Sequence, residues 1–508
     1  MKNPIKRTDF ICLLGAVIVA GTLCLEASAE SSQKKLNVLF IMADDFNTAL
    51  SGYGHPQCKT PNLDRLAKRG TSFTRAYCQF PLCGPSRASI MSGRHPLSNG
   101  VTDNAKKLRA DTITLAQCFR QAGYWTGRVS KIYHMGVPGN IFTGDSGHDV
   151  EKDWMEHYNV SVMETITPGK AEDLMLEDSM HLYEDLRKKW PAYKHKGGKF
   201  RIPEGNHQGV DFVVVEADCG NEALADGIAA TQGIELLQQR AEAKKPFFLA
   251  VGFVRPHVPL VAPRASFEEY DASAMQLPEL RAGDLDDMPA GAKGQTNNRK
   301  YKMSEENQRK VLRGYYASVS YMDEQVGRLL DEVDRLGLRE NTLIVFVSDH
   351  GYHLGEHTMW QKMSLLEESI RVPLIVSAPN QKRVDAKSDA IVELLDIYPT
   401  LTELAGLTAP ADLQGESFAA LLTDPSVLRS KKEAMIQVGN SFCLRTKRWA
   451  YMRYNVKGKS PESMLYDMKT DPKQYTNLAG KPEYAEIEKD LRKRLDARMA
   501  SAKERSQE

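Results

Sequence analysis

Three short apolar runs set the pattern of the chain. They cover residues 36–42, 246–254 and 343–347, and each is followed directly by ionisable residues. Runs of this length without polar alternation are typical of strands that are buried on both faces of a parallel sheet. Because ligand sites in open α/β sheets form beyond the carboxyl ends of the strands, the pattern predicts one composite site where the three strands end.

Segments with apolar residues at helical spacing lie between and after these runs. The predicted helices cover residues 60–67, 113–122, 314–336 and 391–404, and a further strand is predicted over 125–129. Pro61, next to the expected start of the first helix, is typical of a first helical turn. Strand and helix signals that alternate in this way favour an α/β fold.

Two polar segments interrupt the alternation, and the pattern changes near residue 430. We interpret residues 145–209, which carry a basic stretch from Arg187 to Arg201, as an insertion over the predicted site, and residues 271–302 as a second long loop. Beyond residue 430 the sequence predicts a small α+β subdomain over 431–508, after a large α/β domain over 30–430. Its elements are two strands over 441–454, a strand over 465–467 and a helix over 483–500.

The first 29 residues have the layout of a secretory signal peptide. Lys2, Lys6 and Arg7 precede the apolar residues 10–25, and a small-x-small cleavage site ends at Ala29. The apolar stretch is short for a membrane span. The sequence therefore predicts export to the periplasm or the cell exterior, and a mature chain without a membrane span. A lipoprotein anchor at Cys24 is the alternative, but Leu23 is bulkier than a lipobox residue.

Composition and charge restrict the possible functions. The chain has 508 residues, of which 42% are hydrophobic and 26% charged, which is ordinary globular composition. A net charge of +1 lacks the basic excess of nucleic-acid-binding proteins, so no nucleic-acid partner is expected. Six of the eight cysteines lie outside the leader, without a C-x-x-C pair, which indicates neither a zinc ribbon nor a dithiol redox motif.

Carboxylates follow two of the apolar runs. Asp44 and Asp45 end the first run, and Asp349 and His350 follow the last one. Clustered carboxylate oxygens are ligands suited to Ca²⁺ or Mg²⁺. Adjacent aspartates are equally common as turn caps, but their place at one strand end, mirrored by Asp349 at another, favours a metal site.

A zinc site is the alternative for the histidines near residue 350. His350, His353 and His357 include a His-x-x-x-His spacing, which on a helix would place two imidazoles on one face. Gly351 and Gly355 interrupt such a helix, and the glutamate of a His-Glu-x-x-His motif is missing. The segment therefore favours a loop beside a carboxylate-bound ion.

The run Cys83-Gly84-Pro85-Ser86-Arg87, continued by Ala-Ser and a Gly-Arg pair, resembles the signature of the type I sulfatases. In that family a separate maturation enzyme oxidises the cysteine to formylglycine, whose hydrated aldehyde attacks the sulfur of a sulfate ester. The resemblance implies an alkaline-phosphatase-like large domain with a central mixed, mainly parallel sheet. It also implies one Ca²⁺ per chain, with the ligands Asp44, Asp45, Asp349, His350 and the modified Cys83.

Further basic residues match catalytic positions of the same family. Arg87 lies four residues after Cys83, so on a helix the two share a face, near a helix start that favours anions. The Lys131-x-x-His134 element resembles a lysine–histidine pair of the family. In that pair the lysine contacts the aldehyde hydrate and the sulfate, and the histidine is the base that releases sulfate. His257 resembles a sulfate-binding histidine and candidate acid for the leaving oxygen, and Lys362 a lysine on the substrate side.

Several details resemble the iduronate-2-sulfatase branch of the family. They include Arg255-Pro256-His257-Val258-Pro259 and Trp360, two residues before Lys362. This resemblance implies a sulfated saccharide as substrate, with uronate 2-O-sulfate in a polysaccharide such as a glycosaminoglycan as the expected group. Two alternatives stay open: a phosphonate or phosphodiester hydrolase of the same superfamily, and a glycan-binding protein without activity. The environment of Lys131, His134 and His257 favours sulfate.

Overall fold

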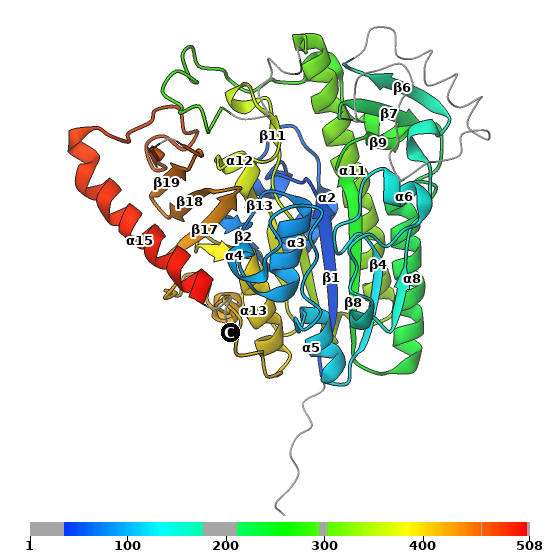
Figure 1. Ribbon diagram of the computed structural model, residues 1–508. Helices are drawn as coiled ribbons and strands as arrows, with labels where there is room; N and C mark the ends of the chain where they lie inside the picture. The colour runs from blue at the N-terminus through cyan, green and yellow to red at the C-terminus, as the bar shows by residue number, and fades with distance from the viewer. Residues whose placement is uncertain (1–34, 176–210, 294–300, 302, 459, 505–508) are drawn as a thin grey trace, which may run out of the picture. The chain divides into compact units, whose positions relative to one another are not determined.

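Figure 1 shows the computed structural model of the chain, in which residues 35–175, 211–293, 301, 303–458 and 460–504 are described. Leu36–Glu508 form one compact unit, separate from Met1–Lys35. The predicted leader and the basic stretch from Arg187 to Arg201 lie outside the described residues. Among the described residues, no helix has the length and apolar character needed to cross a membrane.

An eight-stranded sheet forms the centre of the unit, in the order β15-β2-β14-β10-β1-β8-β4-β5. In this sheet only β14 runs antiparallel to its neighbours. The prediction of a mixed, mainly parallel central sheet is therefore confirmed. The strands are β1 (Asn37–Asp44), β2 (Thr71–Phe73), β4 (Trp125–Ser130), β5 (Glu156–Tyr158), β8 (Phe247–Pro256), β10 (Thr342–Ser348), β14 (Leu374–Ser377) and β15 (Ala386–Ser388).

The three predicted apolar strands lie side by side in the middle of this sheet. β1 pairs in parallel with β10 on one side and with β8 on the other. Every residue of the three strands is buried, which explains why their sequences lack polar alternation. Their carboxyl ends consequently meet at one edge of the sheet, as the sequence predicts.

Two hydrophobic cores cover the two faces of the sheet. Alternate side chains of β1 divide between them, Leu39 and Ile41 on one face and Phe40 and Met42 on the other. Helices α8 and α11 cover the first face and α3 and α13 the second (Figure 1). The main helices are α2 (Pro61–Lys68), α3 (Cys83–Ser92), α5 (Leu115–Gln121), α8 (Ala225–Ala243), α11 (Glu305–Arg335) and α13 (Ile397–Leu404).

Helix boundaries follow local capping and tertiary pairing. Helix α11 begins nine residues before the predicted 314–336 segment, because the Ser304 side chain accepts a hydrogen bond from Asn307 N (3.2 Å) and caps it there. The predicted helix over 391–404 is wrong in its first half. That half forms β16 (Val392–Glu393), which pairs with β3 (Ala76–Tyr77), and the 3-10 turn η8 (Leu394–Asp396).

The predicted insertion over 145–209 is also wrong in part. Residues Glu156–Tyr158 form β5, the edge strand of the central sheet beside β4. An edge strand is partly solvated, so its polar sequence resembles a loop. The other minor strands and helices are β6 (Gly169–Asp173), β7 (Val213–Ala217), β9 (Leu260–Pro263), β11 (His353–Leu354), β12 (Trp360–Gln361), β13 (Arg371–Val372), α4 (Pro96–Asn99), α6 (Gly139–Thr143), α9 (Arg264–Glu268), α12 (Glu367–Ile370) and α14 (Ala419–Thr423).

The last part of the described chain is an antiparallel sheet covered by a helix. The elements are β17 (Glu433–Val438), β18 (Ser441–Thr446), β19 (Trp449–Tyr454), β20 (Glu462–Asp467) and α15 (Ala485–Glu504). The sequence predicts all of them except β17. Leu491 and Leu495 of α15 pack on one face of this sheet, while its other face joins a core of the central sheet. The α+β segment is thus continuous with the rest, and a domain boundary at residue 431 stays a prediction.

Leu249→Ala in β8 tests the central core. Leu249 is fully buried, and truncation of a buried leucine usually costs about 3 kcal/mol because a cavity remains. We expect a clear fall in the urea midpoint of unfolding. Leu428→Ala, at a side chain that is 95% exposed, is the matched control and should leave the midpoint unchanged. Equal midpoints for the two variants would contradict this account of the core.

Candidate active site

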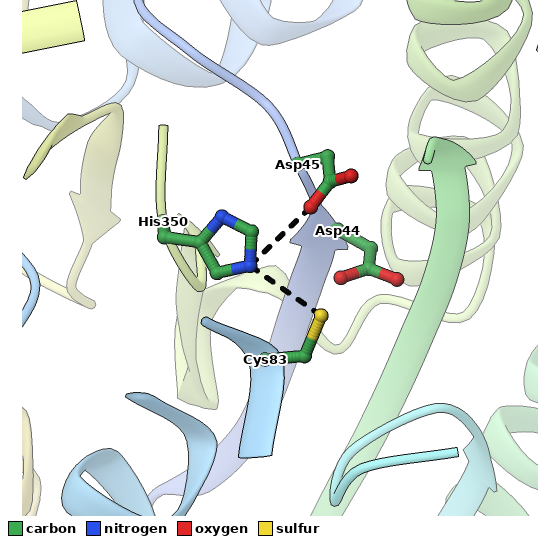
Figure 2. Close-up of side chains that lie close together, drawn as sticks. All are labelled: Asp44, Asp45, Cys83 and His350. Carbon is green, nitrogen blue, oxygen red and sulfur yellow. Dashed lines mark hydrogen bonds and ion pairs between the residues drawn. The ribbon is translucent and has the colours of Figure 1, made fainter. Parts of the chain in front are cut away.

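Four buried side chains converge at the carboxyl edge of the sheet. They are Asp44 at the end of β1, Asp45 just beyond it, Cys83 at the start of α3 and His350 after β10 (Figure 2). Their possible ligand atoms all lie within 4.8 Å of one another. The sequence-predicted composite site therefore assembles from segments more than 260 residues apart, since His350 Nε2 lies 3.4 Å from Cys83 Sγ.

Cys83 is the first residue of α3, and all residues of that helix are buried. The Gly84 N–H donates to Asn104 Oδ1 at 2.8 Å, and a Cβ at position 84 would lie only 2.8 Å from that oxygen. Glycine is thus the residue that fits this close approach. The start of α3 favours negative charge, because the first N–H groups of a helix have no partner within the helix and carry partial positive charge.

Arg87 links α3 to the carboxyl ends of β1 and β10 through ion pairs. Its Nε donates to Asp349 Oδ2 at 2.7 Å, and its Nη2 lies 3.4 Å from Asp44 Oδ1. It also donates to the backbone oxygens of Lys131 and Ala43. The guanidinium is fully buried, so in this arrangement it neutralises carboxylates beside the cluster.

Two lysines flank the sulfur of Cys83. Lys131, which follows β4, donates to Asp44 Oδ2, and its Nζ lies 4.0 Å from Sγ. Lys362, which follows β12, donates to Asp45 Oδ1 at 2.5 Å, and its Nζ lies 3.4 Å from Sγ. The ammonium groups therefore offer N–H donors to an anion bound next to residue 83.

The histidines face the same centre. His350 Nε2 lies 3.3 Å from Asp45 Oδ1. His257 Nε2 lies 3.7 Å from Asp45 Oδ2, and its Nδ1 lies 2.6 Å from the Val258 carbonyl oxygen. His134 interacts with the Cys83 side chain, and burial lowers the pKa of its imidazole. The structure thus brings His134, His257 and His350 to the same centre as Arg87, Lys131 and Lys362.

The electrostatic field of the site favours an anion at residue 83. Burial alone would raise the pKa of the Cys83 thiol, but Lys131, Lys362 and His350 together lower it well below its ordinary value. By contrast, burial and the nearby carboxylates of Asp323 and Glu269 raise the pKa of the Cys58 thiol. A low pKa in a cluster of cations is typical of a reactive site.

The carboxylates leave room for a cation. Asp44 Oδ1 and Asp45 Oδ2 are buried and have no hydrogen-bond partner. Orphaned buried oxygens of this kind fit ligands of a hard cation. Asp349 lies beside the cluster, where its oxygens accept from Arg87 Nε, Asp45 N and His350 N.

The structure does not favour the zinc alternative. His353 Nε2 lies 2.6 Å from Ser364 Oγ, and His357 Nδ1 lies 2.9 Å from Asp284 Oδ2. These two histidines therefore bond to other parts of the chain, and neither belongs to the cluster around His350.

Sequence reasoning missed a tyrosine that supports Asp45. Asp45 has a φ of 62°, in the left-handed region that non-glycine residues rarely adopt. The Tyr315 hydroxyl donates to the Asp45 carbonyl at 2.8 Å and accepts from Asn47 N at 3.0 Å. Tyr315 lies inside α11, where a buried aromatic residue looks like an ordinary core residue, so no signal in the sequence marks it.

Comparisons with known proteins identify the family. The family model described as sulfatase matches residues 36–407, and one for the C-terminal part of N-sulphoglucosamine sulphohydrolase matches residues 355–501. Iduronate 2-sulfatase from Mus musculus is 30% identical over 447 residues, covering 80% of this chain and 74% of the relative. N-acetylglucosamine-6-O-sulfatase from Bacteroides thetaiotaomicron is 29% identical, covering 97% and 91%.

Solved structures share the fold. A protein in complex with its substrate D-glucosamine-2-N,6-O-disulfate superposes with a TM-score of 0.70 at 23% identity, covering 93% of this chain and 99% of that one. A phosphonate monoester hydrolase from Silicibacter pomeroyi gives a TM-score of 0.72 at 22% identity, covering 92% and 96%. At these identities the likeness shows the alkaline-phosphatase-like fold alone.

The match to the sulfatase model and the curated relatives define a sulfuric ester hydrolase. With 372 of its residues in that match (36–407), the chain belongs to the sulfatase family.

A thiol titration tests the field around Cys83. The sample is protein with an unmodified cysteine at position 83, and a chelator is present. The thiolate absorbance of Cys83 should titrate well below pH 9, because the nearby cations favour the charged form. The absorbance difference against Cys83→Ser isolates this group. Lys362→Met should move the titration to higher pH. A midpoint at or above pH 9 in the wild-type chain would contradict the described electrostatics.

Proposed function

We propose that the chain is an exported sulfatase that hydrolyses sulfate esters of a sulfated saccharide. The reaction uses a formylglycine formed at Cys83 by a maturation enzyme, and one Ca²⁺ held by Asp44, Asp45, Asp349, His350 and residue 83. The observation that carries the proposal is the set of cations around Cys83 Sγ, next to two buried carboxylate oxygens that lack hydrogen-bond partners. Export rests on the signal-peptide layout of the first 29 residues.

The proposed substrate is a uronate 2-O-sulfate within a polysaccharide. Relatives named iduronate 2-sulfatase and N-acetylglucosamine-6-O-sulfatase support a sulfated sugar, and a structural neighbour holds a disulfated glucosamine. The iduronate-2-sulfatase-like features Arg255–Pro259 and Trp360 support the position of the sulfate. Trp360 is fully buried, so we infer that it supports the β11–β12 hairpin that carries Lys362 and leaves the sugar to other residues.

The lysines and Arg87 prepare the site for a sulfate group. A hydrated aldehyde at position 83 supplies the oxygen nucleophile, and the sulfur atom of Cys83 stands in for its oxygens here. Lys131 and Lys362, next to that position, bind the sulfate oxygens and offset the negative charge that grows on them in the transition state. Arg87 keeps Asp44 and Asp349 in place beside the α3 start.

His257 and His134 each carry out one proton transfer. His257, whose Nε2 faces the cluster, donates a proton to the oxygen of the leaving sugar as its bond to sulfur breaks. His134 then removes a proton from the second hydroxyl at residue 83, so that the C–O bond to sulfate breaks and the aldehyde returns. Water hydrates the aldehyde again and thereby completes the hydrolysis. Burial lowers the pKa of His134, which keeps it neutral and able to accept that proton near pH 7.

The cation has an electrostatic role. A Ca²⁺ held by Asp44, Asp45, Asp349 and His350 would supply positive charge that polarises sulfate oxygens and offsets the negative charge of the ester. Asp44 Oδ1 and Asp45 Oδ2, which have no hydrogen-bond partner, are the oxygens that would bind it.

A phosphonate or phosphodiester hydrolase is the second candidate. A phosphonate monoester hydrolase shares the fold with a TM-score of 0.72. The sulfatase family match and the Lys131–His134 pair favour sulfate over this alternative.

Modification of Cys83 and substrate choice are tested together. Mass spectrometry of the peptide that holds Cys83 should show a form about 18 Da lighter than the thiol, as expected for conversion of –CH₂SH to –CHO. The modified enzyme should hydrolyse 2-O-sulfated uronate oligosaccharides, and Cys83→Ala should be inactive. Full activity of Cys83→Ala, or turnover of phosphonates and phosphodiesters but none of the sulfated sugars, would refute the proposal.

Asp45→Asn tests the calcium site. The substitution keeps the size of the side chain but removes the charge, so we expect loss of the bound Ca²⁺, measured by equilibrium dialysis, together with most activity. Asp111→Asn removes an exposed carboxylate paired with Arg109 and is the control that should bind about one Ca²⁺ per chain. Normal turnover by chelator-treated wild-type protein would show that no cation takes part.

A further inference from the structure

A buried ion pair lies behind the turn that carries His257. Arg255, at the end of β8, is fully buried, and its Nη2 bonds to Oε2 of Glu164, which is 2% exposed. Glu164 begins the 3-10 turn η3 (Glu164–Ile166), within the segment that the sequence suggested as an insertion.

The guanidinium fixes both ends of the turn. Arg255 Nη1 donates to the carbonyl oxygens of His257 (2.8 Å) and Pro259 (2.9 Å). The carbonyl between them, that of Val258, remains free to bond to His257 Nδ1 at 2.6 Å. Because Nδ1 is engaged by the backbone, the imidazole is held with Nε2 toward Asp45.

Two carboxylates hold the arginine from the other side. Asp226, near the start of α8, accepts hydrogen bonds from Val254 N (2.7 Å) and Arg255 N (3.0 Å). Glu164 Oε1 accepts from Ala225 N at 2.8 Å, so it binds the same helix start. Helix α8, turn η3 and the end of β8 therefore share one buried hydrogen-bond network.

Stability alone is a weak reason for such a network. Desolvation of two charges often offsets their attraction, and buried ion pairs can frequently be replaced by apolar side chains without loss of stability. An arginine that donates to two carbonyls of one turn does, however, fix geometry that an apolar side chain could not fix.

We propose that Glu164 and Arg255 are positioning residues for His257, holding its Nε2 where the leaving oxygen of the substrate is protonated. This inference rests on the proposed function, in which His257 is the acid. It assigns a part in the reaction to a segment whose sequence shows no catalytic motif.

Substrates with different leaving groups test the inference. An acid is needed when the leaving alcohol is weakly acidic, as in a sugar sulfate, and hardly needed for 4-nitrophenyl sulfate. Because positioned acids contribute about 10²–10⁴-fold, Glu164→Gln should lower kcat/KM for the sugar sulfate by about 10²-fold. For 4-nitrophenyl sulfate the loss should stay within about threefold. His257→Ala should show the same dependence, and the double variant should lose little more than His257→Ala.

Two further variants make the test specific. Arg255→Lys keeps a positive charge beside Glu164 but has one nitrogen in place of Nη1 and Nη2. It cannot bond to Glu164 and to both carbonyls in the geometry of the guanidinium, so it should reproduce the leaving-group dependence. Glu393→Gln breaks another buried ion-pair network, with Lys431 and Arg498. Glu393→Gln therefore measures the effect of a general loss of stability. We expect it to lower kcat/KM for the sugar sulfate and for 4-nitrophenyl sulfate by the same factor.

The outcomes separate the inference from the proposed function. Equal losses on both substrates in Glu164→Gln and Arg255→Lys, with a leaving-group dependence in His257→Ala, would overturn the inference alone. Absence of that dependence in His257→Ala would overturn the acid role of His257 and the inference with it.

Discussion

The burial of negative charge at the end of β1 is the constraint on which the site depends. Asp44, Asp45 and Asp349 are fully buried or nearly so, and unpaired carboxylates in such surroundings would be very costly. Arg87, Lys131 and Lys362 offset them, and each comes from a different element. The charges therefore force α3, the segment after β4 and the segment after β12 to meet at one point. The ammonium groups of Lys131 and Lys362 also face Cys83 Sγ, where they can donate hydrogen bonds to an anionic substrate.

The last part of the chain supports this arrangement from outside. Arg445 of β18 donates to Glu367 Oε2 at 2.9 Å, and the Tyr77 hydroxyl donates to Glu367 Oε1 at 3.0 Å. Gln474 accepts from Glu367 N at 2.8 Å. Glu367 lies five residues after Lys362, so these contacts steady the segment that carries the lysine. The antiparallel sheet thus helps to build the site although it supplies none of the residues around Cys83.

Sequence reasoning succeeded where one local rule decided the structure. β1, β8 and β10 were predictable because strands buried on both faces are continuously apolar, and the cluster was predictable because charged residues follow those strands. β5 and β16 were not, since short strands form through pairing with distant partners that local patterns do not contain. Glu164 was missed for a related reason. In a polar segment a buried glutamate cannot be told from a solvated one until its partner Arg255 is known.

The burial of α3 also bears on when the chain can mature. All residues of the helix, including Cys83, Pro85 and Arg87, are buried in the folded unit. An enzyme that recognises this short motif has to bind several of its residues at once, and the folded chain presents none of them. The proposed conversion of Cys83 to formylglycine then belongs to the period before α3 docks against the sheet. The rate of folding sets how long the motif stays accessible, so under this proposal a chain that folds too fast would reach its folded structure without the modified residue.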